Sequence, residues 1–146
     1  MKKLMILTTI LMALGISTAF ADNDKPIAVT QLPQKAQLFI KTHFPKEKVA
    51  LAKLERDFLE TRYEVVFTNG SKVEFLKDGE WKEVECKYST VPTAIIPAQI
   101  ASYVSQNYPD TQIVQIDRDK RDYEVKLTNR LELTFDLNFN LIDIDD

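Results

Sequence analysis

The sequence comprises 146 residues, of which 28% are charged and 45% hydrophobic, a balance typical of one compact domain or of two small units that share a core. Its formal net charge of −3 argues against a general nucleic-acid partner, because such a partner requires a basic surface. The single cysteine, Cys86, excludes an internal disulfide framework, so burial and backbone pairing must stabilise the fold.

Residues 1–21 have the pattern of a signal peptide. Lys2 and Lys3 form a basic start, residues 4–18 are apolar apart from small and hydroxyl side chains, and Ala19 and Ala21 stand where a signal peptidase requires small residues. The alternative, an uncleaved anchor, is disfavoured because the apolar run is short for a membrane span and lacks a stop-transfer flank. We therefore expect a periplasmic or secreted protein, soluble after cleavage and without a stable membrane span. Loss of the two lysines would change its net charge from −3 to −5.

Two helices are predicted after a flexible lead-in over residues 22–31, which are polar and contain a proline. The first should span residues 33–43, because proline is favoured at the first helical position and Pro45 ends the helix. The second should span residues 97–107 and end before Pro109. Each carries one apolar stripe with the helical period, formed by Leu32, Ala36, Phe39, Ile40 and Phe44 and by Ile96, Ile100, Tyr103, Val104 and Tyr108.

Four strands are predicted after each helix, because apolar and polar side chains alternate with a period of two. The dipeptides Asn69-Gly70 and Asp78-Gly79 are strong hairpin signals, since both can adopt positive φ. Asn129-Arg130 and Asn138-Phe139 are weaker turns because no glycine follows. The expected strands are 49–56, 62–68, 72–77 and 80–87, then 112–118, 122–128, 131–136 and 140–145.

The same sequence pattern occurs twice in the chain, in residues 32–87 and 96–146, with residues 88–95 as the linker. Aromatic, proline and turn positions stay in order, and every gap falls where a loop is expected. A period of about 60 residues is too long for the usual solenoid units, so we interpret the pattern as a duplicated α+β unit. The matching segments include Leu32-Pro33 with Ile96-Pro97, Phe44-Pro45 with Tyr108-Pro109, and Tyr63-Glu64-Val65 with Tyr123-Glu124-Val125.

The predicted fold class is α+β, with two tandem α-β-β-β-β repeats forming one antiparallel sheet and both helices on one face. Short links favour antiparallel neighbours, and a helix with one apolar stripe must cover the apolar face of its sheet. The other face would then be open. Its expected residues are Glu64, Val66, Lys72, Glu74, Leu76, Glu124, Lys126, Thr134 and Asp136.

The combination of a leader, two short helices ending in an aromatic residue and proline, two Tyr-Glu-Val strands and two Thr-Asn turns resembles the PepSY-like proteins. These are exported bacterial proteins that are compared with β-lactamase inhibitory protein. The resemblance covers nearly all of the chain after residue 21. It implies helices on one side of an antiparallel sheet and a role in binding or restraining an exported enzyme. Its signature consists of apolar and turn residues, so it implies no chemically active side chain.

Candidates for metal binding are isolated. His43 is the only histidine, whereas a zinc site needs several His or Cys ligands. It suits the end of the first predicted helix, where a cation complements the helix dipole. Asp136, Asn138 and Asn140 have the spacing of calcium ligands, but Leu141 stands where glycine is needed and no glutamate follows at position twelve. We therefore favour a hairpin turn there, and predict no metal and no cofactor.

Candidates for catalysis are equally sparse. Glu55-Arg56-Asp57 and Asp117-Arg118-Asp119 could serve acid–base chemistry, but they lie at predicted strand ends, where such clusters are usually solvated. The sequence contains no Ser-His-Asp set, no Cys-His pair and no glycine-rich phosphate loop. Cys86 shares the strand parity of Val84, so we expect a buried thiol, with a reactive or intermolecular thiol as the alternative. We predict no catalytic residue and no enzymatic activity.

Trp81 is the strongest candidate for a binding anchor. It lies three positions before Val84, so in a regular strand it would stand on the open face near Leu76 and Val66. An exposed tryptophan among apolar neighbours is typical of an interface. The alternative is that the Asp78-Gly79 turn or a bulge shifts the parity and buries the ring.

We therefore predict an exported, non-enzymatic binding module, acting as an inhibitor or modulator of a protein or peptide partner such as a peptidase or another envelope enzyme. The alternative is a periplasmic protein that binds a small ligand or peptide, or acts in envelope stress, through a pocket between the repeats. No nucleic-acid partner is expected. The predicted partner-binding face consists of Trp81, Leu76, Val66, Glu64, Glu74 and Lys126.

Overall fold

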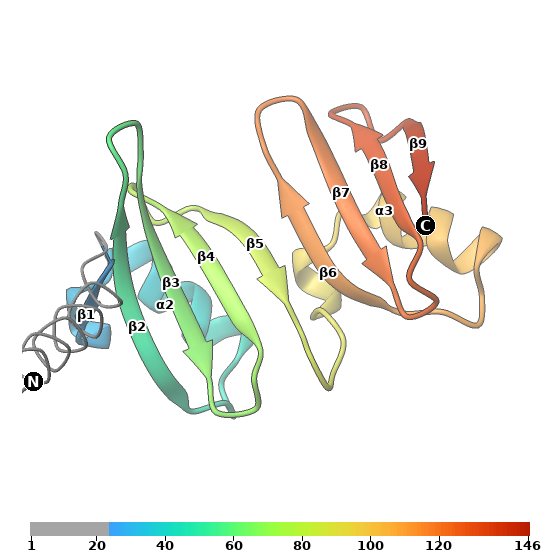
Figure 1. Cartoon of the computed structure of the whole chain (residues 1–146). Coiled ribbons are helices and arrows are strands. Elements are labelled where there is room, and N and C mark those ends of the chain that lie inside the picture. Colours follow the sequence, from blue (N-terminus) through green and yellow to red (C-terminus); the bar gives the residue numbers. More distant parts are fainter. Residues whose placement is uncertain (1–23) are drawn as a thin grey trace, which may run out of the picture.

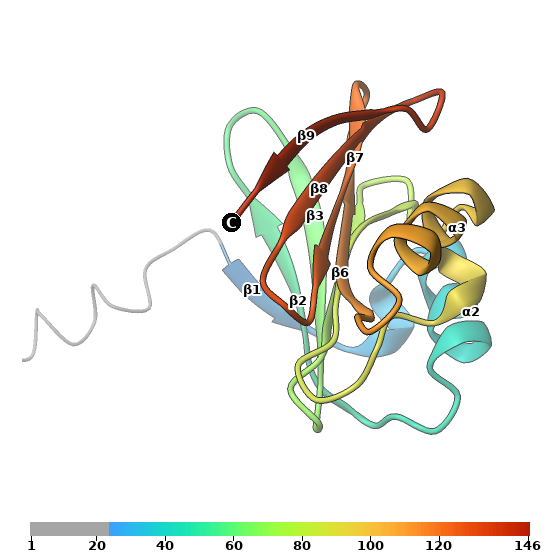
Figure 2. The same ribbon diagram turned by 90° about the vertical axis from the view of Figure 1, so that its right-hand side faces the viewer.

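Nine antiparallel strands form one open sheet, and two helices pack on one side of it (Figure 1). The structure is a computed structural model that describes residues 24–146. Figure 2 shows the sheet edge-on, with both helices on the same side and the other side bare. The strands lie in the order β1 to β9, because short hairpin links place each strand beside its neighbour in sequence. The predicted α+β class is confirmed, while the predicted signal peptide, residues 1–21, lies outside the described residues.

The predicted strands form nearly as expected: the strand over residues 49–56 has the predicted bounds, and most of the others lose one or two residues at an end. Turn residues such as Thr68 and Lys77 lie outside the ladders, because the hairpins close before them. The elements are β1 (Asp24–Ile27), the 3-10 helix η1 (Val29–Gln31), α2 (Gln34–His43), β2 (Val49–Arg56), β3 (Thr61–Phe67), β4 (Lys72–Leu76), β5 (Trp81–Glu85), the 3-10 helix η2 (Thr93–Ile95), α3 (Ala98–Asn107), β6 (Ile113–Arg118), β7 (Asp122–Leu127), β8 (Glu132–Asp136) and β9 (Leu141–Asp145).

The N-terminal segment corrects a prediction. Residues 24–27 form the edge strand β1, not a flexible lead-in, and pair with β2 from Asp24 opposite Glu55 to Ile27 opposite Ala52. The segment has no period-two alternation, so its own sequence gives no strand signal. It pairs because β2 presents unpaired backbone groups, and the Lys53 ammonium reaches the Asp24 carboxylate at 3.1 Å. Pro26 is tolerated because β1 is an edge strand.

Both helices begin one residue later than predicted, because Pro33 and Pro97 are N-caps with extended ψ instead of first helical residues. The predicted apolar stripes face the sheet. Ala36 and Ile100 are fully buried. Aromatic rings from the two helices make matching edge-on contacts with the sheet, 5.5 Å between centroids for Phe39 and Phe75 and 5.5 Å for Tyr103 and Phe135.

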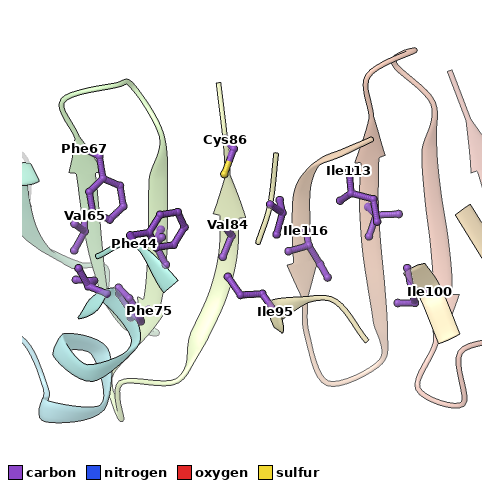
Figure 3. Packing of buried hydrophobic residues seen from close by; sticks show 14 of the residues in the cluster. Phe44, Val65, Phe67, Phe75, Val84, Cys86, Ile95, Ile100, Ile113 and Ile116 are labelled. Atoms are coloured by element: carbon purple, nitrogen blue, oxygen red, sulfur yellow. The ribbon is translucent and has the colours of Figure 1, made fainter. Parts of the chain in front are cut away.

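One continuous core runs under the whole sheet. Val84 of β5 and Ile116 of β6 are fully buried on neighbouring strands, and Ile95 lies beside them in the same buried cluster (Figure 3). Val91 and Ile95 belong to residues 88–95, so this predicted linker contributes buried side chains that are only 2% and 7% exposed. We call the β5–β6 boundary the seam. Because buried residues on both sides of the seam belong to one cluster, the strands before the seam and the strands after it share one core.

The turns without glycine adopt the same geometry as those with it. Gly70 and Gly79 have φ of +87° and +90°, and Arg130 and Phe139 have φ of +74° and +64°. An asparagine precedes Gly70 and Arg130 in their turns. Its side-chain oxygen accepts a hydrogen bond from a backbone N–H: Asn69 Oδ1 from Ser71 at 2.9 Å, and Asn129 Oδ1 from Leu131 at 3.1 Å. Asn129 therefore stabilises its turn although Arg130 occupies a strained left-handed conformation.

Replacing Arg130 with glycine is expected to raise the free energy of unfolding by about 1 kcal/mol, because the left-handed conformation costs a residue with a Cβ about that much. Urea denaturation measures the change. Gly70→Ala at the matching turn is the control and should lower stability, since φ is positive there and the new Cβ would lie 3.2 Å from Lys87 Cδ. An Arg130→Gly variant of unchanged or lower stability would contradict the strain.

Candidate functional site

A row of carboxylates crosses the open face of the sheet. In the strand register Glu64 lies opposite Glu74, Glu74 opposite Glu83, Glu83 opposite Asp117, and Asp117 opposite Glu124. We call these five residues the acidic row. Their chain neighbours Val65, Val73, Val84, Ile116 and Val125 are fully buried on the helix side. Since side chains alternate along a strand, the row points away from the helices.

The acidic row is electrostatically unfavourable. Like charges directly opposite each other on neighbouring strands destabilise a sheet. Burial raises the pKa of Glu83, and the negative charges of Asp117 and Glu74 raise it further. Burial also raises the pKa of Glu124, together with Glu132 and Asp117. The fold therefore accepts a cost at Glu83 and Glu124. At Glu64 burial alone would raise the pKa, but hydrogen bonds with Glu55 and Lys53 outweigh it and lower the pKa.

Cations flank the row without neutralising all of it. Arg62 reaches Glu74 at 2.8 Å, Lys82 reaches Asp117 at 3.1 Å, and Lys53 reaches Glu64 at 3.3 Å. Burial alone would lower the pKa of Lys53, but hydrogen bonds with Asp24, Glu55 and Glu64 raise it. Within residues 24–146, Glu83 and Glu124 form no salt bridge, and Glu83 accepts a hydrogen bond from Gln115 at 2.7 Å. The centre of the open face thus keeps negative charge.

Five of the six residues predicted for a partner-binding face lie together on this side. Glu64 and Glu74 belong to the acidic row. Val66, Leu76 and Lys126 share their strand parity and are half-buried beside the row. Their use by a partner stays a prediction.

The sixth residue, Trp81, is not on the open face. A β-bulge between Glu74 and Phe75 places Trp81 opposite Phe75, so its ring lies toward α2, 6.4 Å from the ring of Phe39. The Arg118 guanidinium stacks over the indole at 3.9 Å from the ring centroid, and Arg118 Nε donates to the Trp81 carbonyl at 2.9 Å. The prediction of an open-face Trp81 is therefore wrong, and the alternative of a parity-shifting bulge is confirmed.

Trp81 instead lines a hollow of about 430 Å³ at the end of the seam. Its other walls include Leu76, Arg118, Lys120 and Tyr123. The Glu80 carboxylate fixes one side, because it binds Lys35 at 2.9 Å and Arg118 at 3.0 Å. We call this site the seam hollow. Sequence reasoning missed Arg118 and Tyr123, because only the pairing of β5 with β6 brings them to Trp81.

The paired aspartates serve their own turns. Asp57 Oδ1 accepts the backbone N–H groups of Leu59 and Glu60, both at 2.9 Å. Asp119 Oδ1 accepts the backbone N–H groups of Arg121 at 2.7 Å and Asp122 at 3.0 Å, and these hydrogen bonds lower the pKa of Asp119. Neither carboxylate is held as a partner of another reactive group. The geometry fits turn formation.

The other isolated candidates also have structural partners. Asp136 Oδ1 accepts two turn N–H groups at 2.9 Å, which supports the hairpin. His43 packs against Phe39 at 4.6 Å between ring centroids, and burial lowers its pKa. Cys86 is buried as expected, and burial raises the pKa of its thiol. Within residues 24–146, no three or more His, Cys, Asp or Glu side chains are grouped so that they could hold a metal ion.

Comparison with known families decides the relationship that this geometry suggests. The family described as "Putative beta-lactamase-inhibitor-like, PepSY-like" matches residues 61–143, more than half of the chain. The chain belongs to the PepSY-like family. All five residues of the acidic row lie within the matched range. The resemblance predicted from the turn and aromatic pattern is confirmed.

Three solved structures from Bacteroides resemble this PepSY-like chain. One from Bacteroides thetaiotaomicron is 67% identical, has a TM-score of 0.85, matches 86% of this chain and 99% of its own, and is described as a "putative calcium-regulated periplasmic protein". One from Bacteroides vulgatus is 60% identical, with a TM-score of 0.83 and coverage of 86% and 99%, and is described as a "putative periplasmic protein". Another from Bacteroides vulgatus is 37% identical, with a TM-score of 0.81 and coverage of 84% and 99%, and is described as a "putative periplasmic protein of unknown function".

Among curated proteins none matches this chain. The three solved relatives are described as periplasmic, and we assign the PepSY-like chain to the same compartment. In residues 24–146 neither helix is long and apolar enough to cross a membrane.

Glu83→Gln is expected to raise the free energy of unfolding by roughly 0.5 kcal/mol at neutral pH, because it removes one charge from two like-charge cross-strand pairs. Because the pKa of Glu83 is raised in the fold, its ionisation destabilises the protein as pH rises through that pKa. The gain should therefore vanish below the ordinary pKa of glutamate, where both states are protonated. Urea denaturation across this pH range checks it. Glu85→Gln, which loses a salt bridge to Lys72, is the control and should give no gain.

Proposed function

We propose that this PepSY-like protein is an exported, non-enzymatic binding module whose open sheet face binds a basic partner. The observation that carries the proposal is the acidic row, in which carboxylates lie opposite one another on the open face and, within residues 24–146, Glu83 and Glu124 form no salt bridge. A complementary row of lysine or arginine side chains would relieve that repulsion on binding. The partner class is an exported protein or peptide, and the family description supports an inhibitor or modulator of an envelope enzyme such as a peptidase.

The dimensions of the face suit such a partner. Neighbouring strands lie about 4.8 Å apart, so five residues on five adjacent strands span roughly 20 Å. That length fits within one side of a standard protein interface, which buries about 800 Å² per partner. Val66 and Leu76 beside the row would supply apolar contact area.

We also propose that the fold arose by duplication of one helix-and-four-strand unit, as the sequence pattern predicts. Matching hydrogen bonds support this, since the Thr68 N–H reaches the Lys48 carbonyl at 2.8 Å and the Thr128 N–H reaches the Gln112 carbonyl at 3.0 Å. The acidic row needs both units, because Glu64, Glu74 and Glu83 come from the first and Asp117 and Glu124 from the second. The units are not interchangeable in this role, because Thr134 stands at the position of Glu74.

Crosslinking capture from an envelope fraction tests the binding role. The triple variant Glu74→Gln, Glu83→Gln and Asp117→Asn is expected to lose capture of its partner at least about tenfold, which corresponds to 1.4 kcal/mol or more of binding free energy. The control Glu47→Gln, Asp110→Asn and Asp146→Asn removes the same charge at positions outside the acidic row and should keep capture. Equal capture by the triple variant and the wild type would contradict the role of the row.

The calcium in the description of the 67% identical relative suggests one further arm of this experiment. No preformed metal group exists in residues 24–146, so calcium would act here only by competing for exposed carboxylate oxygens. We expect calcium chloride to weaken partner capture more than sodium chloride at equal ionic strength. Equal effects of both salts would show that calcium has no specific effect on partner capture by this protein.

The seam hollow supports a second candidate function, binding of a small ligand or peptide between the two units. Its volume of about 430 Å³ lies within the usual range of ligand pockets, and it combines two aromatic rings with the cations Arg118 and Lys120. Trp81 is the only tryptophan, so its emission reports directly on this site.

A thermal-shift screen with peptides, lipids and sugars distinguishes the two functions. A hollow ligand should raise the melting temperature and change Trp81 emission, and Tyr123→Ala should reduce its affinity at least about tenfold. The double row variant Glu74→Gln and Glu83→Gln, which keeps the ion pair between Asp117 and the hollow-lining Lys82, should bind it unchanged. A ligand that binds without altering Trp81 emission would argue against the hollow.

A further inference from the structure

The sheet contains three strands in equivalent positions, β1, β5 and β9. For β1 and β5 the evidence is their register on the next strand. Asp24 lies opposite Glu55 in β2, and Glu83 lies opposite Asp117 in β6, where Glu55 and Asp117 match in the sequence pattern. Each of the two strands precedes a 3-10 turn and a helix. Thus β1 covers the edge of β2 as β5 covers the edge of β6.

For β5 and β9 the evidence is their register on the preceding strand. Val84 lies opposite Val73, and Ile144 lies opposite Leu133. The register shifts at the same place in both pairs, between Glu74 and Phe75 of β4 and between Thr134 and Phe135 of β8, which leaves one extra residue in β5 and one in β9. β9 therefore has the same shape and orientation as β5.

The outer edge of β9 is bare, unlike that of β5. In residues 24–146 no strand pairs with β9 on that side. Val84 is fully buried at the seam, whereas the matching Ile144 is 49% exposed and Ile142 is 58% exposed. An unpaired edge strand with exposed isoleucines is a template for another strand. The seam shows which kind of strand fits: an antiparallel one with an apolar residue opposite Ile144.

The edge of β2 in a second copy offers that strand. There β9 would take the place of β1. Asp143 would lie opposite Glu55, Ile144 opposite Leu54, and Asp145 opposite Lys53. Ile144 would then face Leu54, where β1 places the charged Lys25. Asp145 would face Lys53, where β1 places Pro26.

Charge favours this partner over a second β9, although Asp143 would face Glu55 as Asp24 does in the single molecule. Two β9 strands would bring Asp143 and Asp145 against their own copies, which is repulsive. The Lys53 ammonium already binds the carboxylate of Asp24, whose place Asp143 would take. The competing strand β1 has only four residues, three of them exposed. Its displacement gives up the packing of Ile27 against the core but little other apolar burial.

We propose that β9 of one copy replaces β1 at the edge of β2 in a second copy, joining the molecules head to tail in one continuous sheet. The interface is heterologous, so further copies can add in the same way. The proposal does not rest on the binding role of the acidic row, although the Lys53 ammonium that Asp145 would face also contacts Glu64 of that row at 3.3 Å.

Sedimentation velocity on the chain beginning at Asp22 tests the exchange. We expect concentration-dependent dimers and larger species. Asp24→Cys with Glu55→Cys staples β1 to β2, because these residues are direct cross-strand partners. The oxidised variant should stay monomeric and should associate again when reduced. Cys86 does not interfere, because it is buried.

Two further variants define the register without relying on the staple. Ile144→Lys, at an exposed position, should raise the dissociation constant at least about tenfold. A mixture of Glu55→Cys and Asp143→Cys chains should form a mixed disulfide dimer. A wild-type chain that stays monomeric at every concentration, a stapled variant that associates unchanged, or Asp143→Cys chains that pair only with themselves would each overturn the proposal.

Discussion

The pairing of β5 with β6 is the contact on which the rest of the structure depends. Three register pairs join the two strands, Glu83 with Asp117, Val84 with Ile116, and Glu85 with Gln115. On the helix side the pairing buries Val84 and Ile116 completely. Without it there would be two small sheets, each with an exposed apolar edge and too little core to be secure alone.

The same seam creates both the acidic row and the seam hollow. It continues the acidic row from β5 into β6, because Glu83 and Asp117 face each other across it. It forms the hollow, because Arg118 reaches Trp81 only across this boundary. The bulge turns Trp81 to the helix side, whereas Leu76 lies on the open face and also lines the hollow, so the two surfaces meet at Leu76. A protein partner that covers Leu76 and a small ligand in the hollow would therefore compete for that side chain.

The sequence predicted most of the fold because its signals are local. Period-two alternation places Val65 and Phe67 inward and Glu64 outward, and this needs only the geometry of a strand. Helix positions follow from the apolar stripes and from Pro45 and Pro109. The turns at Asn129 and Asn138 form without glycine, because asparagine and aspartate oxygens satisfy the turn N–H groups directly. Their strained φ values appear only in three dimensions.

By itself the sequence determined the class of fold, the family and the face on which Glu64, Glu74 and Lys126 lie, because alternation and turn chemistry act over a few residues. The tertiary structure alone decided three features. A bulge of one residue turned Trp81 away from the open face, the β2 edge drew residues 24–27 into a strand, and the seam aligned carboxylates from both units into one row. Each depends on pairing between strands that lie on different hairpins or across a bulge, where register is set by the whole sheet and not by the residues nearby.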